Sequence, residues 1–287
     1  MSPQEETPKD SVQELFAFWI TERTRILHNR EQGLPKPWTD DPILKNYRFC
    51  NVRREDDTVT KFVRSWMLPW ANHQNLLLGA AIARFTNVPN TIAQIGFPDI
   101  WSAPDVLEKL DAMDAANQKI WTSAYIVSTN GHAMPKAKYV VQTVLDPLAK
   151  ACKQGQWPRT LAALHARLTQ FNGVGSFMSG QIIADLKNTT GSPWSTVNDE
   201  WMDFVVPGPG SRRGLARLIG RPAPYTLSDK EFYNHFALAR RIAYSTHKHG
   251  VPILCAQDVQ NCLCEFDKYM RVKLNEGRPR QTYTGWS

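Results

Sequence analysis

The feature that most constrains the fold is a pair of apolar helical stretches joined by a glycine turn, "LHARLTQFNGVGSFMSGQIIADL" at residues 164–186. The turn glycines allow close approach of the backbone, and the second helix begins with N–H groups that have no partner within the helix. Ser179, a small residue, stands six positions after the first turn glycine, where two helices can pack closely. The pattern is typical of a helix–hairpin–helix that holds a DNA phosphate through Gly173, Val174, Gly175 and Ser176. A plain helical hairpin is the alternative, because short glycine turns are common.

Helical signals continue through most of the chain. Ser11 with Glu14, and Ser228 with Glu231, have the spacing of capping boxes, and an apolar stripe runs through residues 256–276. The best alternating strand pattern is the short "YIVS" at 125–128. We therefore expect a mostly α chain with a flexible segment at 1–10 and a single helical domain at 11–287.

The formal net charge of +7 favours an acidic partner, and nucleic acid is the commonest such partner for a basic protein. No apolar run reaches the roughly 20 residues of a membrane helix, and the polar, acidic start "MSPQEETPKD" does not resemble a signal or transit peptide. Five cysteines, an odd number, indicate a reducing compartment such as the cytoplasm. Cys255, Cys262 and Cys264 do not have the spacing of an iron–sulfur site, so we expect neither metal nor cofactor.

An anion site is indicated by "VVPGPGSRRGLARLIG" at 205–220. A glycine-rich turn exposes backbone N–H groups, and the helix that follows presents its positive end. Ser211 is the expected N-cap, and forked arginine donors suit phosphate oxygens. The residues expected at the site are Gly208, Gly210, Ser211, Arg212 and Arg213. Because the sequence has no Gly-x4-Gly-Lys-Ser/Thr, this anion is not expected to be a nucleotide held in a P-loop.

Three further stretches carry charged groups suited to chemistry. "WSTVNDEWMDFVV" holds Asp199, with Glu200 and Asp203 as neighbours. In "LCAQDVQNCLCEFDKYMRV" at 254–272, four- and three-residue spacing puts Asp258, Cys262, Glu265 and Tyr269 on one helix face. This face could hold an amine or could form a structural ion network with Arg48 or Arg53. "YRFCNVRREDDTVTKFVRSW" at 47–66 interleaves cations with aromatic residues, which suits nucleic acid or, alternatively, a salt-bridged helix start.

Four of these blocks together resemble a known family. "RFCNVRREDDTVTKF", "FNGVGSFMSGQIIADL", "PGPGSRRGL" and "QDVQNCLCEFDKYMR" resemble the α-glutamyl/putrescinyl thymine pyrophosphorylases, or amino acid:DNA transferases, and occur in the expected order from about residue 47 to 272. That family is related to the helical domain of some 5-hydroxymethyluracil DNA kinases. The resemblance implies a DNA glycosylase-like helical fold and a bacteriophage enzyme of thymine hypermodification in double-stranded DNA. A kinase forms a 5-pyrophosphoryloxymethyl group on uracil, and the transferase then replaces diphosphate with the amine of an amino acid or polyamine.

The resemblance also implies roles for residues. Glycosylases with this hairpin place a catalytic aspartate shortly after it, which makes Asp199 the first candidate for a general base, with Asp258 and Glu265 behind it. Cys50 is a candidate for addition to the uracil ring, although a buried structural cysteine is the simpler interpretation. The binding residues implied are Gly208, Gly210, Ser211, Arg212, Arg213, Arg53 and Arg54 for diphosphate, Asp258, Glu265 and Lys268 for the amine, and Gly173, Val174, Gly175, Ser176, Arg48 and Arg64 for DNA. A base-excising DNA glycosylase and a non-catalytic DNA-binding module are the alternatives.

Overall fold

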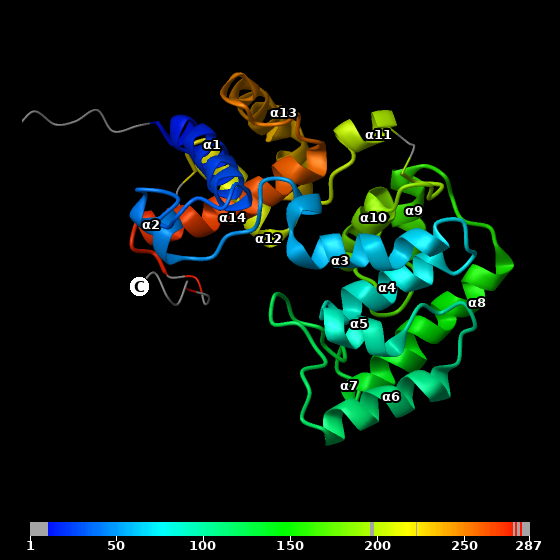
Figure 1. Cartoon of the computed structure of the whole chain (residues 1–287). Coiled ribbons are helices and arrows are strands. Elements are labelled where there is room, and N and C mark those ends of the chain that lie inside the picture. The colour runs from blue at the N-terminus through cyan, green and yellow to red at the C-terminus, as the bar shows by residue number, and fades with distance from the viewer. Residues whose placement is uncertain (1–10, 196–197, 222, 278, 280–281, 283–287) are drawn as a thin grey trace, which may run out of the picture. The chain divides into compact units, whose positions relative to one another are not determined.

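The computed structural model describes residues 11–195, 198–221, 223–277, 279 and 282, so the expected flexible segment 1–10 lies outside the described residues. Within these residues the regular elements are helices, apart from one isolated bridge between Tyr47 and Thr282, which confirms the all-α class (Figure 1). The stretch 125–128, which has the best alternating pattern in the sequence, does not form a strand. Its residues are irregular and the side chain of Ile126 is 88% exposed, because no second strand lies beside it to accept its backbone hydrogen bonds.

The chain forms two compact units. Unit 1 joins residues 1–54 to residues 207–287, and unit 2 consists of residues 55–206. The organisation of 11–287 as a single domain stays a prediction. Among the described residues, no helix combines the length and the apolar character needed to cross a bilayer.

Unit 1 is built on helices whose starts follow from the sequence. Both capping boxes are confirmed: the Glu14 N–H donates to Ser11 Oγ at 3.2 Å, and the Glu231 N–H donates to Ser228 Oγ at 3.3 Å. Phe16 and Phe266 pack against each other in the core, with tilted rings whose centroids are 5.1 Å apart. The elements of unit 1 are α1 (Val12–Glu31), α2 (Pro42–Asn46), α12 (Pro209–Leu218), α13 (Asp229–Ser245), η4 (Thr246–His249) and α14 (Ala256–Lys273).

Glycines bring α12 and α14 close together. A Cβ atom on Gly214 would collide with the backbone carbonyl of Leu263, and one on Gly210 would collide with Cys264 Sγ. Neither glycine has a positive φ, so the turn does not need them for a left-handed conformation. The glycines at 210 and 214 are therefore explained by helix packing, a role that the sequence pattern alone did not indicate.

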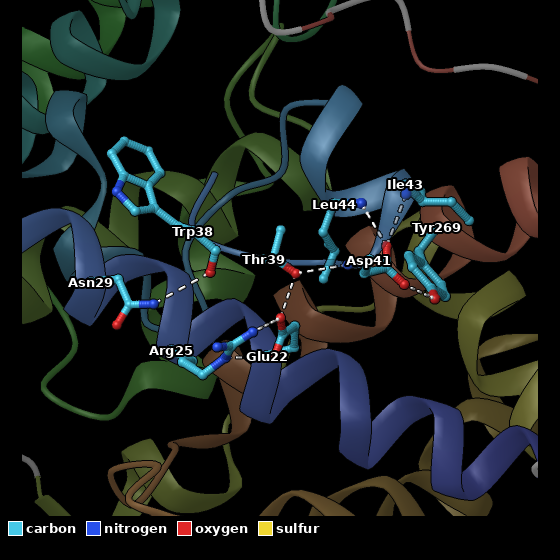
Figure 2. Close-up of polar contacts among 9 residues, drawn as sticks. All are labelled: Glu22, Arg25, Asn29, Trp38, Thr39, Asp41, Ile43, Leu44 and Tyr269. Atoms are coloured by element: carbon cyan, nitrogen blue, oxygen red, sulfur yellow. Dashed lines mark hydrogen bonds and ion pairs between the residues drawn. The ribbon is translucent and has the colours of Figure 1, made fainter. Parts of the chain in front are cut away.

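Polar contacts anchor α2 on α14 (Figure 2). The Tyr269 hydroxyl, which belongs to α14, donates to Asp41 Oδ2 at 2.8 Å. The other carboxylate oxygen of Asp41 accepts from the N–H groups of Ile43 and Leu44 at 2.9 and 2.7 Å, and so caps α2. One aspartate thus starts α2 and attaches it to α14 just before segment 48–54 begins.

The segment between α1 and α2 is held to α1 in the same view (Figure 2). Arg25 donates to Glu22 from Nε at 2.9 Å, and the Thr39 hydroxyl also donates to Glu22. Burial alone would raise the pKa of Glu22, but these hydrogen bonds outweigh it and lower that pKa. The carboxylate therefore stays ionised and fixes the path of the chain towards α2.

Unit 2 packs around α4 (Leu76–Thr86), in which every residue is buried. Arg84 of α4 donates from Nε to Asp185 of α10 at 2.5 Å, and both side chains are almost fully enclosed. The pair ties the central helix to the second helix of the glycine hairpin. The other elements of unit 2 are α3 (Thr58–Met67), η2 (Leu68–Trp70), α5 (Pro89–Ile95), α6 (Ala103–Ala115), α7 (Lys136–Lys138), the π-helix η3 (Tyr139–Leu145), α8 (Asp146–Gln154), α9 (Leu161–Leu168), α10 (Ser176–Asn188) and α11 (Asn198–Asp203), while η1 (Arg54–Asp56) lies at the boundary.

Candidate active site

The polar face of α14 carries the residues that the sequence placed at four- and three-residue spacing. It is buried: the exposed fractions of Asp258 and Glu265 are 5% and 8%, and Cys262 is completely enclosed. Segment 48–54, which follows α2, covers this face. The structure therefore brings together two blocks that are more than 200 positions apart in the sequence.

Backbone N–H groups of segment 48–54 donate to both carboxylates. The Cys50 N–H donates to Glu265 Oε2 at 2.9 Å, and the Arg54 N–H donates to Asp258 Oδ1 at 3.2 Å. Between them, Asn261 Nδ2 donates to the carbonyl of Asn51 at 3.2 Å. The other oxygen of Asp258, Oδ2, accepts from the Cys255 N–H at 3.3 Å and from the Cys255 thiol at 3.1 Å, so both oxygens of this carboxylate are held in place.

Lys268 closes one end of this arrangement. Its ammonium group lies 3.0 Å from Glu265 Oε2, donates to the Arg48 carbonyl at 2.5 Å and sits 4.6 Å from the centroid of the Phe49 ring. The three residues expected to hold an amine thus lie on one helix, but the ammonium group already present beside Glu265 is that of Lys268 itself. At this end of the polar face of α14, the charged residues form a structural ion network, which was the alternative to an amine site.

The cysteines of this region differ in exposure. Cys50 is exposed, so the interpretation of a buried structural cysteine is wrong for it. Burial raises the pKa of the Cys264 thiol to about 12 and that of Cys262 well above its ordinary value. Those two thiols stay protonated at neutral pH and do not act as nucleophiles. Among the described residues, His, Cys, Asp and Glu side chains form no group of three or more that could hold a metal ion.

At the start of α12 the N-cap is Gly208 and not Ser211. Pro209 occupies the first helical position, where its fixed φ favours an earlier start. The buried Ser211 hydroxyl turns back to the cap and accepts from the Gly208 N–H at 3.0 Å. Ser211 therefore supports the turn from within.

The two arginines of the turn each have a carboxylate partner. Arg213 Nε lies 2.9 Å from Asp267 Oδ2, and Arg217 Nε lies 3.0 Å from the other oxygen of that completely buried aspartate. Arg212 forms an ion pair with Asp229 at the start of α13. Asp267 was not among the residues predicted from the sequence, because local patterns do not show which side chain of α14 faces α12.

The glycine turn in unit 2 joins α9 to α10 as expected. Gly173 has φ +79°, and Gly175 is the N-cap of α10 without a capping side chain. A cleft of about 440 Å³ beside the turn is lined by Phe85, Ile126, Val127, Ser128, Asn130, Thr169, Gln170, Phe171, Asn172, Gly173, Val174, Gly175, Phe177 and Met178. Its lining contains no charged side chain.

The remaining predicted residues also lie in unit 2. Asp199 is exposed in the first turn of α11, whereas Glu200 accepts the N–H of Leu161, the first residue of α9, at 2.6 Å. Arg64 is half-buried on α3. The carboxylates Asp258 and Glu265 belong to unit 1 together with the arginine turn, while Asp199 belongs to unit 2 with the hairpin.

Comparison with known proteins identifies the family. The family model described as "5-hmdU DNA kinase, helical domain" matches residues 10–278. The chain belongs to this family. It is also similar to the 5-hmdU DNA kinase of Bacillus phage SP10, with 26% identity over 293 residues that cover 92% of this chain and 45% of the phage protein. The chain thus spans less than half the length of that relative. No solved structure matches it.

Proposed function

We propose that the chain is an enzyme of phage-type thymine hypermodification, which displaces diphosphate from 5-pyrophosphoryloxymethyluracil in double-stranded DNA with the amine of an amino acid or polyamine. The observation that carries the proposal is the packing of segment 48–54 on α14. It places the backbone of a segment that contains Arg48, Arg53 and Arg54 against two oriented carboxylates, in a chain whose family is that of 5-hmdU DNA kinase helical domains. The specific reaction, displacement of diphosphate by an amine, is inferred from the four sequence blocks that resemble the thymine pyrophosphorylases.

The reaction needs stabilisation of the leaving group. The amine nitrogen forms a bond to the exocyclic methylene carbon, the bond from that carbon to oxygen breaks, and diphosphate leaves with the electron pair. We assign Arg53 and Arg54, with Arg212 and Arg213, to this anion. Arg213 forms its ion pair with Asp267 through Nε, and this pair orients the guanidinium group. The terminal N–H groups of that guanidinium suit phosphate oxygens.

The reaction also needs a base, because a protonated amine is not a nucleophile. Asp199 is our first candidate, since it is exposed while its neighbour Glu200 accepts a hydrogen bond from the first N–H group of α9. Asp258 and Glu265 are buried and take backbone hydrogen bonds, which suits the holding of an amine more than the exchange of protons with solvent. The target base has to leave the DNA stack to react, and we assign the hairpin residues Gly173–Ser176 to the DNA backbone.

The test is to incubate the protein with DNA that contains 5-pyrophosphoryloxymethyluracil and a mixture of amino acids and polyamines. We expect release of diphosphate and a nucleoside whose mass is increased by the amine. Asp199→Asn should slow adduct formation by about 10²–10⁴-fold, the usual contribution of a general base. Asp203→Asn, a nearby carboxylate on the same helix, is the matched control and should react normally.

Three outcomes would contradict parts of this proposal. Alkali-labile abasic sites without an amine adduct would make the protein a DNA glycosylase. Binding of this DNA with neither product would leave a non-catalytic DNA-binding module. Equal rates for Asp199→Asn and the wild type would remove Asp199 from the role of base while leaving the reaction itself in place.

A further inference from the structure

The net positive charge of the protein resides in one of its two units. Unit 1 contains 22 Lys and Arg residues against 14 Asp and Glu residues, a net charge of +8, whereas unit 2 contains 12 against 13, a net charge of −1. The whole excess of the chain therefore belongs to residues 1–54 and 207–287. Because the predicted DNA hairpin lies in the other unit, the hairpin does not account for this charge.

After its first turn, helix α13 contains no acidic residue, and neither does the following η4. After Glu231 the next acidic residue in the sequence is Asp258. The residues between them include Arg240, Arg241 and Lys248, together with His235, His247 and His249. The first eighteen residues of this acid-free segment, 232–249, lie in α13 and η4. The positive charges are therefore carried by two consecutive helices.

The exposed side of α13 is a single stripe. Its buried side consists of Phe232, Phe236, Ala239 and Ala243, and the helix packs with this side on α1, α12 and α14. The opposite side is exposed at intervals of three to four residues, which is the repeat of one helix face. The side chains of Tyr233 and Tyr244 are 54% and 69% exposed, and Lys230, Arg241 and Lys248 are exposed on the same stripe.

The two acidic residues of α13 lie at its N-terminal end, so the stripe from Tyr233 to Lys248 contains no acidic residue. Asp229 forms an ion pair with Arg212, and Glu231 accepts hydrogen bonds from Ser228 and Tyr225. The exposed positions of residues 229–249 also contain no Leu, Ile, Val or Met, so the stripe lacks the apolar face of a membrane-binding helix. Cations and tyrosine hydroxyls are instead the groups that contact DNA phosphates.

We propose that the stripe formed by Lys230, Tyr233, Arg241, Tyr244 and Lys248 binds the sugar–phosphate backbone of double-stranded DNA. It would be a second DNA contact, in the unit that does not contain the hairpin. From Lys230 to Tyr244 the helix rises about 21 Å, and duplex DNA carries one phosphate per about 1.7 Å of axis. Several phosphates are therefore within reach of these side chains. The inference rests on the proposed function only in taking DNA as the ligand.

The test compares two double variants with the same loss of charge. Arg241→Gln with Lys248→Gln removes two cations of the stripe, and Lys119→Gln with Lys153→Gln removes two exposed lysines of unit 2. Binding of unmodified duplex DNA is measured between 50 and 200 mM salt. Each phosphate contact contributes about 0.9 to the slope of log K against log salt, so the stripe variant should bind more weakly, with a slope shallower by about 1.8. The control should keep the wild-type slope.

Each result decides the proposal. Wild-type affinity and slope in the stripe variant would overturn it, as would an equal loss in the control, which would mean that overall charge alone matters. In both cases diphosphate release by the wild type would remain as the test of the proposed function. Failure of the wild-type protein to bind DNA at all would overturn both. Both variants change exposed side chains, so their thermal unfolding should match that of the wild type.

Discussion

Substitutions at the two glycines of the hairpin turn should have different effects, one on folding and the other on DNA binding. Gly173 has φ +79°, and a Cβ atom there would lie 2.6 Å from Val144 Cγ2 and 3.0 Å from the Tyr139 hydroxyl. Left-handed strain of about 1–2 kcal/mol and overpacking of about 1–3 kcal/mol predict that Gly173→Ala lowers the free energy of unfolding by about 2–5 kcal/mol. Variants at Gly173 therefore report on folding and cannot isolate DNA binding.

A substitution at Gly175 can test DNA binding without disturbing the fold. It has φ −70° and ψ 171°, which any residue adopts, and a Cβ atom there meets nothing within 4 Å. Gly175→Asp should cap α10, because its carboxylate can accept from the free N–H groups of the first turn. The better cap and the helix dipole together predict a gain of about 0.5–1 kcal/mol in the free energy of unfolding. The same carboxylate would occupy the place proposed for a DNA phosphate and would repel it.

We therefore expect Gly175→Asp to unfold at a higher urea concentration while binding duplex DNA more weakly. Charge-assisted hydrogen bonds contribute about 1.5–3 kcal/mol, so DNA affinity should fall roughly tenfold to 150-fold. Gly175→Asn is the control: it caps the helix without the charge, and it should lose less affinity. Wild-type DNA affinity in Gly175→Asp, with its stability raised as expected, would refute the assignment of this turn to DNA.

Two further predictions concern charged groups. Asp185→Ala should lower the free energy of unfolding by about 3–5 kcal/mol in urea titrations, because it leaves the buried Arg84 without its carboxylate, whereas Arg84→Met with Asp185→Leu should cost much less. A large loss in both variants would mean that packing, and not charge, dominates there. Hydrogen bonds from Ser228, first from its backbone N–H, and from Tyr225 lower the pKa of Glu231 to about 2, so their stabilisation is present above its unfolded pKa near 4.5 and is lost as the pH falls towards 2. Ser228→Ala should raise the pKa of Glu231 in an NMR titration, and an unchanged pKa would show that the hydroxyl contributes nothing.

The sequence alone determined the features that depend on neighbouring residues. The capping boxes at Ser11 and Ser228 and the glycine turn between α9 and α10 could be located because caps and turns act over three or four positions. The spacing of Asp258 and Glu265 on one face of α14 follows in the same way from helical periodicity. The four sequence blocks also led to a family related to the one that the comparison with known proteins identified.

Only the tertiary structure decided what those residues face. The polar side of α14 could have faced solvent, but Glu265 accepts from the N–H of Cys50, a residue 215 positions away. Arg213 pairs with Asp267, and Gly210 leaves room for Cys264, because α12 packs against α14. Such pairings depend on which helices meet and at what rotation, and the free energy that selects them comes from burial summed over the whole core. The pattern of one segment contains neither the partner nor the rotation, so it cannot distinguish an arginine that binds a ligand from one that holds two helices together.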